Sequence, residues 1–113
     1  IHANGRFTLG ENIADYGGLQ VSFQAFKTAT ANTPLEDKLG FTPEQRFFLA
    51  YANVWAGNIR PEEILRRTKD DPHSLGKWRV DGALPHIPAW YEAFGITEKD
   101  PMFVPVAERV HIW

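Results

Sequence analysis

Two acidic residues, Glu11 and Asp15, lie four positions apart in a segment that otherwise has the apolar spacing of a packed helix. On a helix, side chains four residues apart project side by side from one face. Adjacent like charges destabilise a helix by roughly 0.2 to 0.5 kcal/mol unless a cation or a basic group lies close to them. The pair therefore predicts a positive group, either a metal ion or a basic side chain, beside this face of the helix.

Glu11 also has a simpler interpretation, because Thr8 stands three residues before it. Thr-x-x-Glu is the pattern of a capping box, in which the carboxylate only bonds back to the start of the helix. Spacing alone favours that interpretation for Glu11. Asp15 has no such explanation. Gly17 and Gly18 follow it at a cost in helix propensity, which indicates close backbone approach by another element.

The remaining residues that could do chemistry lie between positions 71 and 80. His73 follows Asp71-Pro72 in a turn-forming stretch, and Arg79 lies six residues further on in a short run that could be extended. Taken alone, a loop histidine is more often structural than catalytic, and an arginine beside a tryptophan often only stacks on the ring. No two histidines stand four residues apart, so we expect that this chain cannot assemble a three-ligand zinc site by itself.

Composition narrows the class of protein. A chain of 113 residues that is 43% hydrophobic can form one domain with a modest core. A formal net charge of −2 provides no basic field for nucleic acid, so we expect no nucleic-acid partner. The absence of cysteine excludes disulfides and thiolate metal ligands. No apolar run is long enough for a membrane span.

Helical signals dominate the chain and predict a mainly α fold. We expect a first helix at about residues 9–30. A second should start after a Thr42 cap, with Pro43 and Gln45 in its first turn, and stop at Gly57. Two shorter helices should run from Pro61 to just before Asp71 and over residues 88–94. The first should bury a side formed by Leu9, Ile13, Tyr16, Gln20, Phe23 and Phe26, opposite a narrow stripe of Glu11, Asp15, Gly18 and Ser22. The second is apolar almost all round, so we expect burial on several sides. Residues 31–41 and 96–113 are predicted to be a connection and an extended tail.

Several separated motifs, taken together and in order, resemble one family. They are Thr8-Leu9-Gly10-Glu11-Asn12-Ile13-Ala14-Asp15 with Gly17-Gly18-Leu19, then Phe47-Phe48-Leu49 leading to Val54-Trp55, Arg60-Pro61-Glu62, His73-Ser74 with Gly76 and Arg79, and the ending Val110-His111-Ile112-Trp113. In this order and spacing they look like the C-terminal part of the neprilysin and endothelin-converting-enzyme family of zinc metallopeptidases. The resemblance implies that residues 1–113 are the C-terminal helical part of a zincin-type, thermolysin-like catalytic domain.

The resemblance also implies a metal centre. It makes Glu11 the third protein ligand of a catalytic zinc ion, and Asp15 the carboxylate that orients a zinc-bound histidine. Two neutral histidines and one carboxylate leave zinc with net positive charge and an open position, and a carboxylate on the far ring nitrogen fixes the histidine tautomer. Zinc would then be the positive group that the acidic pair predicts.

Four further residues take roles from the same resemblance. His73 matches the histidine that hydrogen-bonds the developing oxyanion. Arg79 matches the arginine that binds a substrate backbone carbonyl and braces the aspartate. Val54 and Trp55 match positions lining the pocket for the substrate side chain after the cleaved bond. Both could equally be ordinary hydrophobic-core residues. The implied activity is hydrolysis of small peptides by a zinc metalloendopeptidase.

The family's His-Glu-x-x-His motif is missing from this sequence. We expect it roughly sixty residues before Glu11, in polypeptide that precedes Ile1. The 113 residues alone are therefore expected to be inactive and to bind zinc weakly or not at all, and the remainder of the catalytic domain is an expected partner. Leu75 replaces a proline common among relatives, and the lack of cysteine suggests a bacterial source.

Other readings stay open. The chain could be a non-catalytic helical protein-interaction module, or part of a pseudoenzyme if the upstream motif is degenerate. A metal-free hydrolase built on Glu11, Asp15 and His73 is disfavoured, because spacing fixes no second base or nucleophile. An exposed aromatic surface could lead the isolated chain to self-associate. By resemblance, an extracytoplasmic location is expected, whether periplasmic, secreted or membrane-anchored.

Overall fold

The computed structural model describes residues 1–112, which form helices and no β-strand. The elements are α1 (Gly5–Thr30), α2 (Pro43–Trp55), α3 (Pro61–Asp70), α4 (Gly76–Asp81), the 3-10 turn η1 (Leu84–His86), α5 (Pro88–Phe94) and the 3-10 turn η2 (Val106–Glu108). The predicted mainly α fold is confirmed. Trp113, which ends the C-terminal motif, lies outside the described residues.

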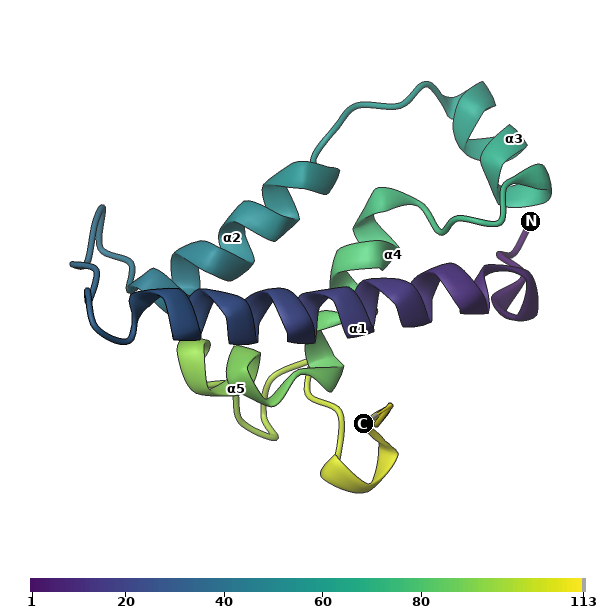
Figure 1. Ribbon diagram of the computed structural model, residues 1–113. Helices are drawn as coiled ribbons and strands as arrows, with labels where there is room; N and C mark the ends of the chain where they lie inside the picture. The colour runs from purple at the N-terminus through teal and green to yellow at the C-terminus, as the bar shows by residue number, and fades with distance from the viewer. Residues whose placement is uncertain (113) are drawn as a thin grey trace.

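The long helix α1 is the element against which the others are arranged. In the view of Figure 1, α2 and α4 lie above α1, α5 and the C-terminal segment lie below it, and α3 stands apart near its N-terminal end. Aromatic side chains join α1 to α2, with ring centroids 5.2 Å apart for both Phe23–Phe47 and Phe23–Phe48. A single core results, whose buried members are Tyr16, Leu19, Phe48, Ala83, Leu84, Ile87, Trp90 and Tyr91.

Helix α1 begins earlier than the sequence pattern predicts. The Asn4 side chain accepts hydrogen bonds from the backbone N–H groups of Arg6 (3.1 Å) and Phe7 (3.2 Å), so asparagine is the N-cap and the helix starts at Gly5. The expected apolar side is also only partly buried. Tyr16 is in the core, but Leu9 and Ile13 are 54% and 39% exposed.

Helix α2 has the predicted start and lacks the predicted burial. Thr42 and Gln45 form a capping box, in which Thr42 Oγ1 accepts from Gln45 N (3.1 Å) and Gln45 Oε1 accepts from Thr42 N (3.0 Å). Within α2 only Phe48 is buried, while Leu49 is 40% and Val54 71% exposed. The prediction of burial on several sides is therefore wrong for this chain, because residues 1–112 cover only one side of the helix.

The later helices start and end at the proline and glycine residues that predict their ends, and one further helix, α4, is present. Helix α3 starts at Pro61 and ends before Asp71-Pro72, and α5 ends at Gly95, whose φ of +62° is the left-handed conformation typical of a helix stop. Helix α4 was not predicted. Arg79 lies within it, so the expectation of an extended run there is wrong. Its six residues include Gly, Trp and Val, whose weak helix propensity is overridden by packing against α2.

Candidate functional site

The acidic face of α1 points toward α4 and toward the loop that follows α3. Because the helix is capped by Asn4, Thr8 lies inside it, and its hydroxyl donates to the carbonyl of Asn4 (3.3 Å). The capping-box interpretation of Glu11 is therefore wrong, since the helix starts at Gly5, three residues before Thr8, and has Asn4 as its own cap. Glu11 is left free to face another group.

Asp15 and Arg79 form the strongest ion pair of the site. Arg79 Nε donates to Asp15 Oδ2 at 2.6 Å and Arg79 Nη2 donates to Asp15 Oδ1 at 2.8 Å, a bidentate arrangement. The two side chains are only 13% and 12% exposed. The hydrogen bonds that Arg79 donates to Asp15 raise the pKa of Arg79 above its ordinary value. A basic partner beside the acidic pair, as the spacing predicts, is confirmed.

Arg79 is held on its other side by the end of α2. Its Cζ lies 4.0 Å from the centroid of the Trp55 ring, a cation–π distance. Gly76 makes this packing possible, because a Cβ at that position would lie 2.7 Å from the backbone oxygen of Trp55. The start of α4 therefore fits against α2 only with glycine there.

His73 lies between two carboxylates. Its Nδ1 is 2.7 Å from Asp71 Oδ1, and the same oxygen accepts a hydrogen bond from the His73 backbone N–H at 2.9 Å. Its Nε2 is 3.3 Å from Glu11 Oε2. The ring can be a donor on both sides when both nitrogens carry protons. The Asp71 contact fixes the direction in which Nε2 points.

Asp71 was not singled out from the sequence. The hydrogen bonds from the backbone and then the side chain of His73 hold its pKa below the ordinary value, so it is a carboxylate at neutral pH. The available signal was the Asp-Pro-His order, in which an aspartate bonds the backbone two residues on and so fixes the turn. This residue belongs to the site because it sets the orientation of His73.

Of the hollows that adjoin these groups, two bear on the residues predicted from the sequence. One, of about 320 Å³, is lined by Val54, Trp55, His73 and Arg79 among others. The sequence-predicted substrate residues are thus next to two of the predicted catalytic ones. The second, of about 370 Å³, lies between α1 and α2 beside Asp15 and Gly18. A Cβ at Gly18 would meet no atom within 4 Å, so the expected close approach of another element at Gly18 is wrong for the described residues.

Within residues 1–112, no group of three or more histidine and acidic side chains is arranged to hold a metal ion. Glu11 nevertheless has the chemistry of a zinc ligand, because it is a carboxylate. Its side chain is 43% exposed, and one of its oxygens faces His73 Nε2 across the site. A zinc site that includes Glu11 would require further donors, because the described residues bring no group of three such ligands together.

The M13 peptidase model, described as "Peptidase family M13", matches residues 1–110 of this chain. This chain belongs to peptidase family M13. The resemblance to the neprilysin and endothelin-converting-enzyme family is thereby confirmed. Membrane metallo-endopeptidase-like 1 from Mus musculus is 40% identical over 115 aligned positions, covering 99% of this chain, and human neprilysin is 41% identical over 96, covering 82%.

A solved structure gives the same result for the fold. The zinc metalloprotease Zmp1 of Mycobacterium tuberculosis, determined with an inhibitor, superposes on this M13 chain with a TM-score of 0.93 at 38% identity and 99% coverage. The M13 chain covers only 17% of the Zmp1 chain, 15% of the mouse relative and 13% of human neprilysin. The matched relatives are therefore several times longer than the chain described here.

Proposed function

We propose that residues 1–113 are the C-terminal part of the catalytic domain of a zinc metalloendopeptidase that hydrolyses small peptides. The observation that carries the proposal is the convergence of Glu11 and Asp15 with His73 and Arg79, which come from α1, from the loop after α3 and from α4. Membership of the M13 family supplies the class of chemistry.

In this proposal Glu11 is a zinc ligand, and the other protein ligands and the general base belong to a His-Glu-x-x-His motif outside this sequence. When bound, zinc supplies Lewis acidity toward the peptide carbonyl and lowers the pKa of water. Asp15 orients one of the ligand histidines. Both its oxygens already accept from Arg79, and each has a second lone pair to accept an imidazole N–H.

His73 is the proposed oxyanion donor. Asp71 holds Nδ1 and the backbone N–H, so Nε2 is directed across the site toward Glu11, where the reacting carbonyl would lie next to the metal. A preorganised donor of this kind stabilises the transition state of peptide hydrolysis by roughly 3 to 4 kcal/mol. Arg79, fixed by Asp15 and Trp55, presents its remaining N–H groups to a substrate backbone carbonyl.

Val54 and Trp55 are proposed to line the pocket for the substrate side chain after the cleaved bond. The exposure of Val54 and its place in the hollow with His73 and Arg79 support this role. Trp55 has a second function in the same place, since its ring stacks on Arg79. A pocket with one apolar wall and one cationic wall suits a bulky apolar side chain next to a peptide carbonyl.

The test is peptide hydrolysis by the full-length protein. We expect cleavage of short peptides before bulky apolar residues, loss of activity after removal of metal with a chelator, and recovery with zinc. The 113-residue chain alone should be inactive, because it lacks the remaining ligands and the general base. Chelator-resistant hydrolysis, or activity of the isolated chain, would contradict the proposal.

The competing function is non-catalytic: a helical interaction module, or part of a pseudoenzyme. The exposed apolar side chains of α1 and α2 favour a protein partner in either case. The upstream coding sequence distinguishes the readings, because an intact His-Glu-x-x-His supports the peptidase and a degenerate one the pseudoenzyme.

Location and source are also proposals. None of the helices in residues 1–112 combines the length and apolar character needed to cross a bilayer. We propose an extracytoplasmic site for the full-length protein, and the name of the relative "Membrane metallo-endopeptidase-like 1" supports its membrane-anchored form. The likeness to a mycobacterial enzyme agrees with a bacterial source.

A further inference from the structure

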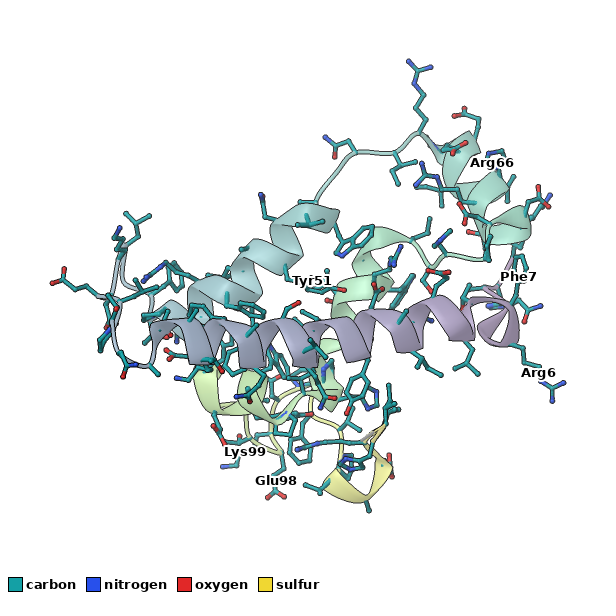
Figure 2. All side chains as sticks on the ribbon, viewed as in Figure 1. Arg6, Phe7, Tyr51, Arg66, Glu98 and Lys99 are labelled. Atoms are coloured by element: carbon teal, nitrogen blue, oxygen red, sulfur yellow. The ribbon has the colours of Figure 1, made fainter. Side chains whose placement is uncertain are left out.

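The last two turns of α2 contact Arg79 at two separate points. The Trp55 ring covers the guanidinium, with Cζ 4.0 Å from the ring centroid. One turn earlier, the Tyr51 hydroxyl donates a hydrogen bond to the backbone carbonyl of Arg79 at 3.0 Å. Tyr51 lies between the ribbons of α2 and α1 in Figure 2, and the bond connects it to α4. Helix α2 thus holds both the side chain and the backbone of one residue.

The carbonyl that Tyr51 binds is one that α4 cannot satisfy alone. The last four carbonyls of a helix have no partner within it, and Arg79 is the third residue from the end of α4. The N–H four residues on, that of Ala83, bonds instead to the carbonyl of Val80 at 3.2 Å. Burial raises the pKa of Tyr51, so its hydroxyl keeps its proton and stays a donor at neutral and mildly alkaline pH.

We propose that Tyr51 is a positioning residue for Arg79: its hydroxyl anchors α4 to α2 so that the guanidinium meets Asp15 and Trp55 in one fixed geometry. This inference rests on the proposed peptidase function, in which Arg79 binds a substrate carbonyl. Helix α4 has only six residues, and its start touches Trp55 through Gly76. The Tyr51 bond is a second tether, placed at the level of Arg79 itself.

Loss of this bond is expected to loosen α4 without removing any group that touches substrate. A single neutral hydrogen bond corresponds to about a three- to tenfold change in an equilibrium or rate constant. We therefore expect Tyr51→Phe to lower kcat/KM of the zinc-loaded, full-length enzyme by about three- to tenfold, mainly through a higher KM, with unchanged zinc content.

The deciding experiment is a double-mutant cycle with Arg79→Lys. If Tyr51 acts through Arg79, the effect of Tyr51→Phe should largely vanish in the Arg79→Lys background, because there is no guanidinium left to position. The matched control is Tyr91→Phe in α5, which removes a hydroxyl that donates to the Pro85 carbonyl at 2.7 Å. That control should lower the melting temperature, leave KM unchanged and combine additively with Arg79→Lys.

Each outcome has one meaning. An unchanged KM in Tyr51→Phe, or an effect of equal size with and without the arginine, overturns the positioning role. A full-length enzyme in which Arg79→Lys itself leaves kcat/KM intact contradicts the proposed function of Arg79 instead. The two failures are therefore distinguishable in the same four proteins.

Discussion

At the scale of single residues, the site depends on two carboxylates that each hold a basic partner. Asp15 binds Arg79 through two hydrogen bonds in a largely buried setting, and Asp71 binds His73 through its backbone and its ring. Removal of one member of a buried pair leaves a charge without a partner, which costs about 3 kcal/mol or more. The largely buried Asp15–Arg79 pair therefore fixes charge as well as geometry, whereas the more exposed Asp71–His73 contact fixes the orientation of the ring.

His73→Ala separates catalysis from metal binding. The variant loses the proposed oxyanion donor, and we expect kcat of the full-length enzyme to fall by about 10²- to 10³-fold while bound zinc stays at the wild-type level. Metal analysis and steady-state kinetics on the same preparation check this. An equal loss of zinc and turnover would assign His73 a structural role.

The sequence could predict these residues only in part. The four-residue spacing of Glu11 and Asp15 required a positive neighbour, and Arg79 is that neighbour. The spacing could not choose between a metal ligand and a capping box for Glu11. The structure excludes only the capping box, because Asn4 caps the helix one turn before Thr8. Asp71 was missed because its role depends on where the His73 ring points, which is a tertiary property.

At the scale of elements, short-range sequence signals predicted where helices start and end, but they did not predict how the helices pack. Proline and capping residues marked the starts of α2, α3 and α5 correctly. Helix α4 could not be foreseen, because six residues with weak propensity become helical only against α2. The exposed side of α2 could not be foreseen either, since its sequence is apolar on faces that residues 1–112 leave open.

Gly76→Ala tests the contact between α4 and α2. A Cβ at position 76 would lie 2.7 Å from the backbone oxygen of Trp55, so one of the two helices must shift. We expect a loss of about 1 to 3 kcal/mol in the free energy of unfolding, measured by urea denaturation. Gly57→Ala is the matched control, because a Cβ there meets no atom within 4 Å. Equal stability of the two variants would show that the contact does not constrain the helices.

The C-terminal segment gives a pH-dependent prediction. His86 Nδ1 accepts a hydrogen bond from the Val110 backbone N–H at 3.0 Å, and burial, followed by the charge of Arg109, lowers the pKa of His86 below 6.5. The unfolded chain therefore binds a proton at a higher pH than the folded chain does. This contribution to stability is complete above the unfolded pKa and is lost as pH falls through the folded pKa.

His86→Asn should reduce the fall in stability between about pH 7 and pH 5, because an amide oxygen can accept the same bond without titrating. Thermal melts of the wild type and the variant across this range measure the difference. Tyr16, whose ring meets His86 edge-on at 6.4 Å, and Arg109 are retained in both proteins. Parallel pH profiles would contradict the role of His86.

At the scale of the whole molecule, the chain is more open than a self-contained domain. Its radius of gyration is 15.5 Å, against about 13 Å expected for a compact domain of this length. Its accessible surface is 8020 Å², against roughly 6,300 Å² expected for a monomer of this mass. Exposed apolar residues on α1 and α2 contribute to the excess. This openness supports the proposal that the rest of a catalytic domain covers these faces.

The isolated 113-residue chain is therefore expected to self-associate. Burying the exposed apolar sides of α1 and α2 against another copy would replace contacts that we propose the rest of the catalytic domain makes in the full-length protein. Sedimentation velocity over a range of concentrations should show dimers or larger species. A single monomeric species at high concentration would remove this prediction, without bearing on the catalytic proposal.

We propose that Glu11 completes a zinc centre, and the most direct test of this role is the zinc content of the full-length protein carrying Glu11→Gln. A neutral amide is a much poorer zinc ligand than a carboxylate, and Glu62→Gln, on the exposed first turn of α3, is the matched control. We predict about one zinc ion per molecule in the wild type and in the control, and a sharp loss in Glu11→Gln. Normal zinc stoichiometry in Glu11→Gln would contradict the account.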